Sequence, residues 1–64
     1  MKRNYRISQA IPAKNHDGST FELQPAEYLA DTDTDGDWVA VYIDIRPTTV
    51  SRADFERVAK LVNL

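Results

Sequence analysis

The sequence predicts a small α+β domain, in which a three-stranded antiparallel sheet (a meander) is packed on one face by a C-terminal helix (βββα). Two Asp-Gly pairs, Asp17-Gly18 and Asp35-Gly36, each stand between strand-like stretches. Asp-Gly is a strong turn signal because glycine adopts positive φ without steric cost. Apolar residues then alternate over 37–45 and recur at helical spacing after residue 51. Two turns therefore join three strands, and the last apolar run supplies the helix.

The first two strands are predicted on either side of the first turn. Apolar and polar residues alternate over 5–11, and Pro12 ends that strand or marks its edge. The second strand begins at residue 20 and reaches Pro25, which cannot occupy a central ladder position. Residues 26–30 either resume this strand after a bulge or form one helical turn, and the strand is the favoured alternative.

The third strand, over 37–45, has the clearest pattern in the chain. Its odd positions carry β-branched residues, which favour strands, and its even positions make the other face. The two faces are Val39, Val41, Ile43 and Ile45 on one side, and Trp38, Ala40, Tyr42 and Asp44 on the other. Pro47 is expected to stop the strand.

Helix signals follow directly. Ser51 suits an N-cap, and Val50 and Phe55 occupy the positions of a hydrophobic staple. An apolar stripe continues at helical spacing and is expected to cover the valine and isoleucine face: Phe55, Val58, Ala59 and Val62. One helix covers only one face, so Trp38 and Tyr42 should point outward on the open side.

Length and composition favour one binding domain over residues 1–64. A chain of 64 residues has room for one small core, and little scaffold remains to hold several catalytic groups in register. The absence of cysteine fits a reducing compartment, and no apolar run is long enough for a signal peptide or a bilayer span. We therefore expect a cytoplasmic protein with no membrane association and no cofactor.

Charge is strongly segregated along the chain. The net charge is −2, yet residues 17–44 hold eight acidic residues and no lysine or arginine, whereas the two ends are basic. The acids are densest in the stretch DTDTDGDW, which begins at Asp31 and ends at Trp38. This stretch is the main candidate for a functional element.

One interpretation of the stretch is a calcium loop. Asp31, Asp33, Asp35 and Gly36 match the opening of the D-x-D-x-D-G pattern, which supplies oxygen ligands at alternate positions. The twelfth position should bring a bidentate glutamate, but it is Tyr42, and a strand follows where a helix should. We therefore predict no specific metal site.

A second interpretation is that the carboxylates imitate nucleic-acid phosphates and occupy a basic groove on a partner. Nearby aromatic residues would serve as apolar anchors. The predicted partner is a basic nucleic-acid-binding protein. The candidate partner-binding residues are Glu27, Asp31, Asp33, Asp35, Asp37, Trp38, Tyr42 and Asp44.

Three alternatives compete with this interpretation. The acids could serve only solubility, since loop and edge charges deter aggregation. Direct nucleic-acid binding by the basic ends is disfavoured, because the acidic centre would repel phosphates within a Debye length of about 8–10 Å. Enzymatic activity is not expected: His16 is the only histidine, and no nucleophile pattern accompanies it.

In size, in its lack of catalytic residues and in its acidic centre, the chain resembles the small phage-encoded anti-CRISPR proteins, several of which act as DNA mimics. The resemblance covers general character across the chain and no diagnostic motif. It implies a stoichiometric inhibitor that blocks a basic DNA-binding or PAM-reading surface of a CRISPR effector in a bacterial host.

The alternative is a small structural or dimerising module whose open sheet face packs on itself, with the acids there for solubility. A tight dimer that buries Trp38 would favour this module, whereas a monomer or weak homodimer leaves the face for a partner.

Overall fold

The computed structural model describes residues 1–62, which form seven short strands and one short helix. In chain order these are β1 (Lys2–Ile7), β2 (Ile11–Lys14), β3 (Thr20–Leu23), β4 (Glu27–Asp31), β5 (Trp38–Ile43), β6 (Arg46–Ser51), α1 (Arg52–Val58) and β7 (Ala59–Leu61).

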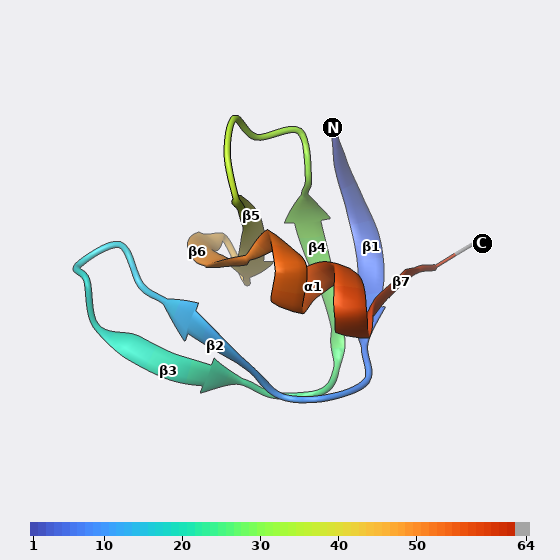
Figure 1. The fold of residues 1–64 in the computed structure, drawn as a ribbon, viewed down its shortest axis with the longest axis horizontal. Helices are drawn as coiled ribbons and strands as arrows, with labels where there is room; N and C mark the ends of the chain where they lie inside the picture. Colours follow the sequence, from blue (N-terminus) through green and yellow to red (C-terminus); the bar gives the residue numbers. More distant parts are fainter. Residues whose placement is uncertain (63–64) are drawn as a thin grey trace.

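The strands make one antiparallel sheet in the order β3-β2-β6-β5-β4-β1-β7. Helix α1 packs against β5 and β6 and lies in front of the sheet in Figure 1, where the β2–β3 hairpin extends away from the other strands. The predicted three-stranded sheet with a covering helix (βββα) is therefore wrong, because the chain is mostly β. Its strands are only three to six residues long. Stretches that were predicted as single elements are therefore divided into two, at positions that carry only a weak sequence signal.

The predicted strand over 5–11 is in fact two strands. β1 pairs with β4 and β7. The chain then bends, and β2 pairs with β3 and β6. Pro12 lies inside β2 and does not end it. It pairs only with Glu22 of β3, since the ladder to β6 begins at Ala13. Proline has no backbone N–H to donate, so it is tolerated where a strand is paired on one side only.

A hairpin that the sequence analysis does not predict lies at the end of β5. Asp44 and Ile45 form a two-residue turn, in which Asp44 has φ 58, and the chain returns as β6 with Ile43 opposite Arg46. Pro47 lies within β6, opposite Tyr42, and does not stop a strand. Because the turn contains no glycine, it carries no Asp-Gly or Asn-Gly signal.

The helix begins as predicted and ends early. The Ser51 hydroxyl accepts a hydrogen bond from the Asp54 backbone N–H, which confirms the N-cap. After Val58 the backbone becomes extended, with Ala59 at φ −99 and ψ 141, and the chain pairs with β1 as β7. The predicted helical stripe as far as Val62 is therefore wrong. Among residues 1–62, no helix has the length and hydropathy needed to cross a membrane.

Several local predictions are confirmed. Gly18 has φ 91 in the turn between β2 and β3, and Gly36 has φ 125 in the loop between β4 and β5. Residues 27–31 form a strand, although β4 pairs with β1 and β5 and does not continue β3. These elements have local chemical causes, namely glycine turns and β-favouring residues.

The core lies in the curve of the sheet under α1. Ten apolar residues are buried there, and they come from every element except β7: Ile7, Ile11, Ala13, Leu23, Ala30, Val39, Val41, Val50, Phe55 and Val58. Buried Thr48 donates its hydroxyl to the Val41 carbonyl, so its polar group is satisfied. Since Val39 and Val41 face this core, the other face of β5 points outward with Trp38 and Tyr42, as predicted.

Candidate binding surface

The predicted site residues lie in two groups at opposite ends of β5. Asp31, Asp33, Asp35, Asp37 and Trp38 lie in or beside the loop between β4 and β5, which protrudes at the top of Figure 1. We call residues 31–37 the acidic loop. The other group is Glu27, Tyr42 and Asp44. Six extended residues span about 20 Å, so the two groups do not make one compact site.

The charge segregation of the sequence is partly undone by the fold, because basic β1 lies beside acidic β4. Arg6 forms an ion pair with Glu27 at 3.4 Å. The Met1 amine lies 3.4 Å from Asp31 and 2.6 Å from Asp33, and the hydrogen bond that it donates to the Asp33 carboxylate raises the pKa of that amine. Glu27, Asp31 and Asp33 are thus partly neutralised within the chain.

Tyr42 also has a basic neighbour from β1. The Lys2 ammonium lies 4.3 Å from the centre of the Tyr42 ring, in a cation–π arrangement, and the ring is half-buried. Tyr42 is therefore less available as an anchor than Trp38, whose side chain is 42% exposed.

The acidic loop is held by Arg52, the first residue of α1. The Arg52 Nε donates to the Gly36 carbonyl at 3.1 Å, and Nη2 lies 3.1 Å from the carbonyls of Thr32 and Trp38. Nη2 also approaches the Thr34 carbonyl at 3.3 Å and its hydroxyl at 2.7 Å. A planar guanidinium with five donors can bind several acceptors at once, so one side chain fixes the path of the loop.

Further hydrogen bonds close the two ends of the loop. The Arg52 backbone N–H donates to the Asp37 carbonyl at 2.8 Å, and the Thr34 hydroxyl donates to the Trp38 carbonyl. At the other end the Asp33 N–H donates to the Asp31 carboxylate at 2.9 Å, which makes a local Asx turn. The cation beneath the loop binds carbonyls and a hydroxyl, and it forms no ion pair with the loop carboxylates.

Two carboxylates of the loop remain without a partner. Within residues 1–62, Asp35 and Asp37 are exposed and make neither an ion pair nor a side-chain hydrogen bond. They flank Gly36 and directly precede Trp38. The structure therefore brings together two unpaired negative charges and one exposed aromatic side chain on a loop of fixed shape.

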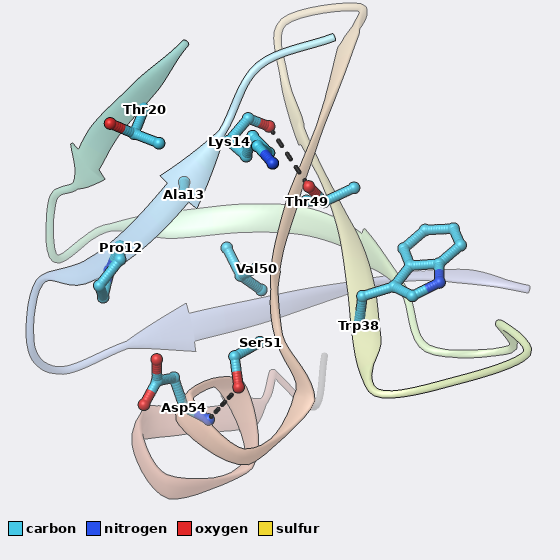
Figure 2. A pocket seen from close by; sticks show the side chains of 9 residues that line it. All are labelled: Pro12, Ala13, Lys14, Thr20, Trp38, Thr49, Val50, Ser51 and Asp54. Atoms are coloured by element: carbon cyan, nitrogen blue, oxygen red, sulfur yellow. Dashed lines mark hydrogen bonds between the residues drawn. The ribbon is translucent and has the colours of Figure 1, made fainter. Parts of the chain in front are cut away.

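A shallow hollow of about 270 Å³ opens beside Trp38, and we call it the Trp38 hollow. Figure 2 shows Trp38 on one side of β6 and the β2 residues Pro12 and Lys14 on the other, with Asp54 at the start of α1. Buried Ala13 and Val50 lie beneath it. Its full lining is Pro12, Ala13, Lys14, Thr20, Trp38, Thr49, Val50, Ser51 and Asp54.

Groups suited to metal binding are not assembled in the part of the chain that is described. No three histidine, aspartate or glutamate side chains among residues 1–62 are placed to hold a metal ion. His16 is exposed in the β2–β3 turn. The neighbouring Asp17 carboxylate accepts hydrogen bonds from the Ser19 hydroxyl and N–H, which lower the pKa of Asp17.

The Asx turn predicts a measurable pH effect. The hydrogen bond from the Asp33 N–H, with smaller contributions from the Met1 amine, lowers the pKa of Asp31 below its ordinary value of 3.8. A lowered pKa means that this stabilisation is complete above pH 3.8 and is lost as the pH falls through the folded-state pKa. Urea unfolding midpoints should therefore fall less steeply with decreasing pH in Asp31→Asn than in wild type. Equal slopes for the two proteins would show that the turn is not formed in solution.

No protein-family model matches the chain, and the comparisons with curated proteins and with solved structures give no match either. The site is thus described from its own geometry.

The role of Arg52 could not be predicted from the sequence. Its charge was visible, but its partners lie 14 to 20 residues away in the chain. Thr34 was likewise indistinguishable from any loop threonine. Arg52 and Thr34 come into contact only because α1 packs beneath the acidic loop.

Proposed function

We propose that this protein is a non-enzymatic binding domain whose acidic loop and Trp38 engage a basic surface of a nucleic-acid-binding protein, and thereby compete with nucleic acid as a DNA mimic. The observation that carries the proposal is the pair of unpaired carboxylates, Asp35 and Asp37, beside exposed Trp38. Charge steers such an encounter, and a desolvated tryptophan is a common anchor of an interface.

The fixed shape of the loop supports the same proposal. A loop already held in one conformation loses less conformational entropy on binding than a mobile one. Arg52 supplies this order through backbone carbonyls and leaves Asp35 and Asp37 to a partner. The proposed surface is smaller than the sequence suggested, since Glu27 and Asp44 lie toward the other end of β5 and Asp31 and Asp33 contact the Met1 amine.

The most concrete form of the proposal is an inhibitor of a CRISPR effector, acting in the cytoplasm of a bacterial host. Blocking a basic DNA-binding or PAM-reading surface requires a small acidic protein, and this chain has 64 residues and a net charge of −2. The target, in chemical terms, is a groove lined by lysine and arginine that normally holds phosphates.

The test compares wild type with the double variant Asp35→Asn/Asp37→Asn. A tagged pull-down from bacterial lysate containing a CRISPR effector identifies the retained protein, whose affinity is then measured directly. We expect the double variant to bind at least about tenfold more weakly, because two charges facing basic residues are lost. Wild-type binding should weaken as salt rises and should be competed by duplex DNA.

A matched control removes the same charge elsewhere. Glu22→Gln/Asp44→Asn alters one acid on β3 and one in the β5–β6 turn, away from the acidic loop. Its affinity should stay within about twofold of wild type, since distant exposed charges are screened. If all three proteins retain the same partner equally, or retain none, the acids serve solubility and the dimerising module becomes the better explanation of the open face.

A further inference from the structure

We propose that the turn between β5 and β6 is the interface of a weak, two-fold symmetric dimer, in which Ile45 of each copy enters a hollow beside the turn of the other copy. This turn lies at the end of β5 opposite the acidic loop, so the inference does not rest on the proposed function. It also differs from a dimer of the open sheet face, because Trp38 stays exposed in it.

Ile45 is the most exposed large apolar side chain among residues 1–62. It is 91% exposed, whereas Trp38 is 42% exposed. Two-residue hairpin turns favour glycine, asparagine and aspartate, and β-branched residues favour strands. The turn therefore does not require an isoleucine, and the core does not bury it. One exposed apolar side chain is common on protein surfaces, so the surroundings of Ile45 decide whether it has a role.

A hollow of about 410 Å³ opens beside this side chain, between the β5–β6 turn and the β2–β3 hairpin, and we call it the turn hollow. Its apolar lining is Phe21 and Ile43, which are only half-buried where they pack against the core. Ile45 of the same chain does not fill the hollow, since that side chain is almost fully exposed. Pockets from about 300 Å³ upward hold small ligands, so one isoleucine side chain fits here. Its entry would remove apolar surface of both copies from water.

The charges beside Ile45 specify a second copy as the occupant. Asp44 and Arg46 both line the turn hollow, and in the described part of the chain neither forms an ion pair or a side-chain hydrogen bond. The sequence runs acid, isoleucine, base. When two such turns meet about a two-fold axis, Asp44 of each copy lies against Arg46 of the other, and all four charges are paired. A purely acidic or purely basic partner would place a like charge against one of them.

Two further titratable groups lie near Arg46 and must be considered. His16 and Asp17 of the β2–β3 turn line a neighbouring hollow together with Arg46. The Asp17 carboxylate accepts hydrogen bonds from the Ser19 hydroxyl and N–H, and it forms no ion pair with Arg46 among residues 1–62. His16 is exposed. The Arg46 guanidinium can therefore pair with Asp44 of a second copy.

The interface is small, so the dimer is expected to be weak. One turn and one hollow on each side bury less than the roughly 1,200 Å² of a standard interface, and we expect a dissociation constant of about 0.1–1 mM. The protein is then a monomer at the micromolar concentrations of the affinity measurement above, so the Asp44 substitution in that control does not disturb it. Two copies held side by side on one partner reach effective concentrations of about 1 mM, at which the dimer forms.

A dilution series tests the dimer directly. Between about 2 mM and 0.02 mM, the amide signals of Phe21, Ile43 and Arg46 should shift with a single dissociation constant, and sedimentation equilibrium should give a mass that rises toward twice that of the chain. The indole signal of Trp38, the only tryptophan, should not move. Ile45→Ser should weaken association at least about tenfold, whereas the control Trp38→Ala should associate as wild type does.

An exchange of charges tests the symmetry of the pairing. Arg46→Glu gives a turn with two acids, and Asp44→Lys gives a turn with two bases. Each variant alone should stay monomeric at about 2 mM, because like charges then face each other across the axis. An equimolar mixture of the two should form a heterodimer, in which every acid faces a base. Circular dichroism and the dispersion of the amide signals establish that each variant is folded.

The inference is overturned if wild type shows no concentration dependence up to about 2 mM, if the shifts centre on Trp38, or if Ile45→Ser associates as wild type does. It is also overturned if the mixture of folded Arg46→Glu and Asp44→Lys stays monomeric. If Asp44→Lys does not fold, because lysine is less favourable than aspartate at φ 58, the results for Ile45→Ser and Arg46→Glu decide. Loss of the proposed function in the pull-down leaves these results unchanged, since its variants lie in the acidic loop.

Discussion

Replacing Phe55 by alanine is expected to unfold most of the protein at 25 °C. Phe55 is 2% exposed, and its ring packs edge to face on Tyr5 with a centroid distance of 5.0 Å. It is the largest side chain among the ten buried apolar residues and the main contact of α1 with the core. Phe-to-Ala substitutions in cores cost about 3–5 kcal/mol, and a domain of this size has about 3–5 kcal/mol in total.

Far-ultraviolet circular dichroism and urea unfolding measure this loss of stability. Two further substitutions serve as controls. Phe55→Leu keeps most of the volume and should remain folded, at a cost below about 1.5 kcal/mol. Leu61→Ala removes a side chain that is 40% exposed on β7 and should change the stability by less than about 0.5 kcal/mol. A Phe55→Ala protein as stable as wild type would contradict the packing of α1 on the sheet.

The parts of the fold that could be predicted have causes within a few residues. Gly18 and Gly36 adopt positive φ, which few other residues do readily, and their turns are where the Asp-Gly pairs indicate. The Ser51 side chain caps the helix three residues before its N–H partner. The alternation over β5 gives the correct inward and outward faces, because the side-chain period of a strand is two.

The parts that could not be predicted depend on contacts between distant residues. The early end of α1 is favoured by the open edge of β1, on which Ala59–Leu61 can pair, and a helical apolar spacing contains no information about that edge. Pro12 and Pro47 looked like strand ends, yet each lies inside a strand. The turn at Asp44 uses an aspartate at φ 58, which is uncommon for a residue other than glycine and is not readable from the sequence.

The candidate site was recognised only in part for the same reason. The density of aspartates in 31–37 was visible, and the loop does protrude beside exposed Trp38. The partial neutralisation of Glu27 by Arg6, and of Asp31 and Asp33 by the Met1 amine, was not visible, because the basic and acidic blocks are separate in the sequence and adjacent in the sheet. Charge counted along a chain is therefore a weaker guide to a surface than charge counted across paired strands.

Replacing Arg52 by alanine is expected to lower the free energy of unfolding by about 2 kcal/mol and to disorder the acidic loop. A hydrogen bond from a charged donor contributes about 1.5–3 kcal/mol, and in the variant water would satisfy part of the acceptors that Arg52 leaves. The Arg52 side chain binds four carbonyls and one hydroxyl of the loop and of Trp38. Urea unfolding gives the stability. Amide hydrogen exchange and the order parameters of residues 32–37 give the effect on the loop.

Two variants distinguish the contribution of the planar guanidinium donors from that of the positive charge. Arg52→Lys keeps the charge but not the five planar donors, so it should recover less than half of the lost stability. Arg57→Ala removes an arginine of the same helix whose partners are Asp54 and Gln9 at the surface, and it should cost less than about 0.5 kcal/mol. If Arg52→Ala leaves the loop as ordered as in wild type, the fixed shape on which the proposed binding depends must come from the Asp31 and Thr34 contacts instead. If the loop becomes mobile and binding weakens although Asp35 and Asp37 are intact, the conformation of the loop contributes to recognition in addition to its charge.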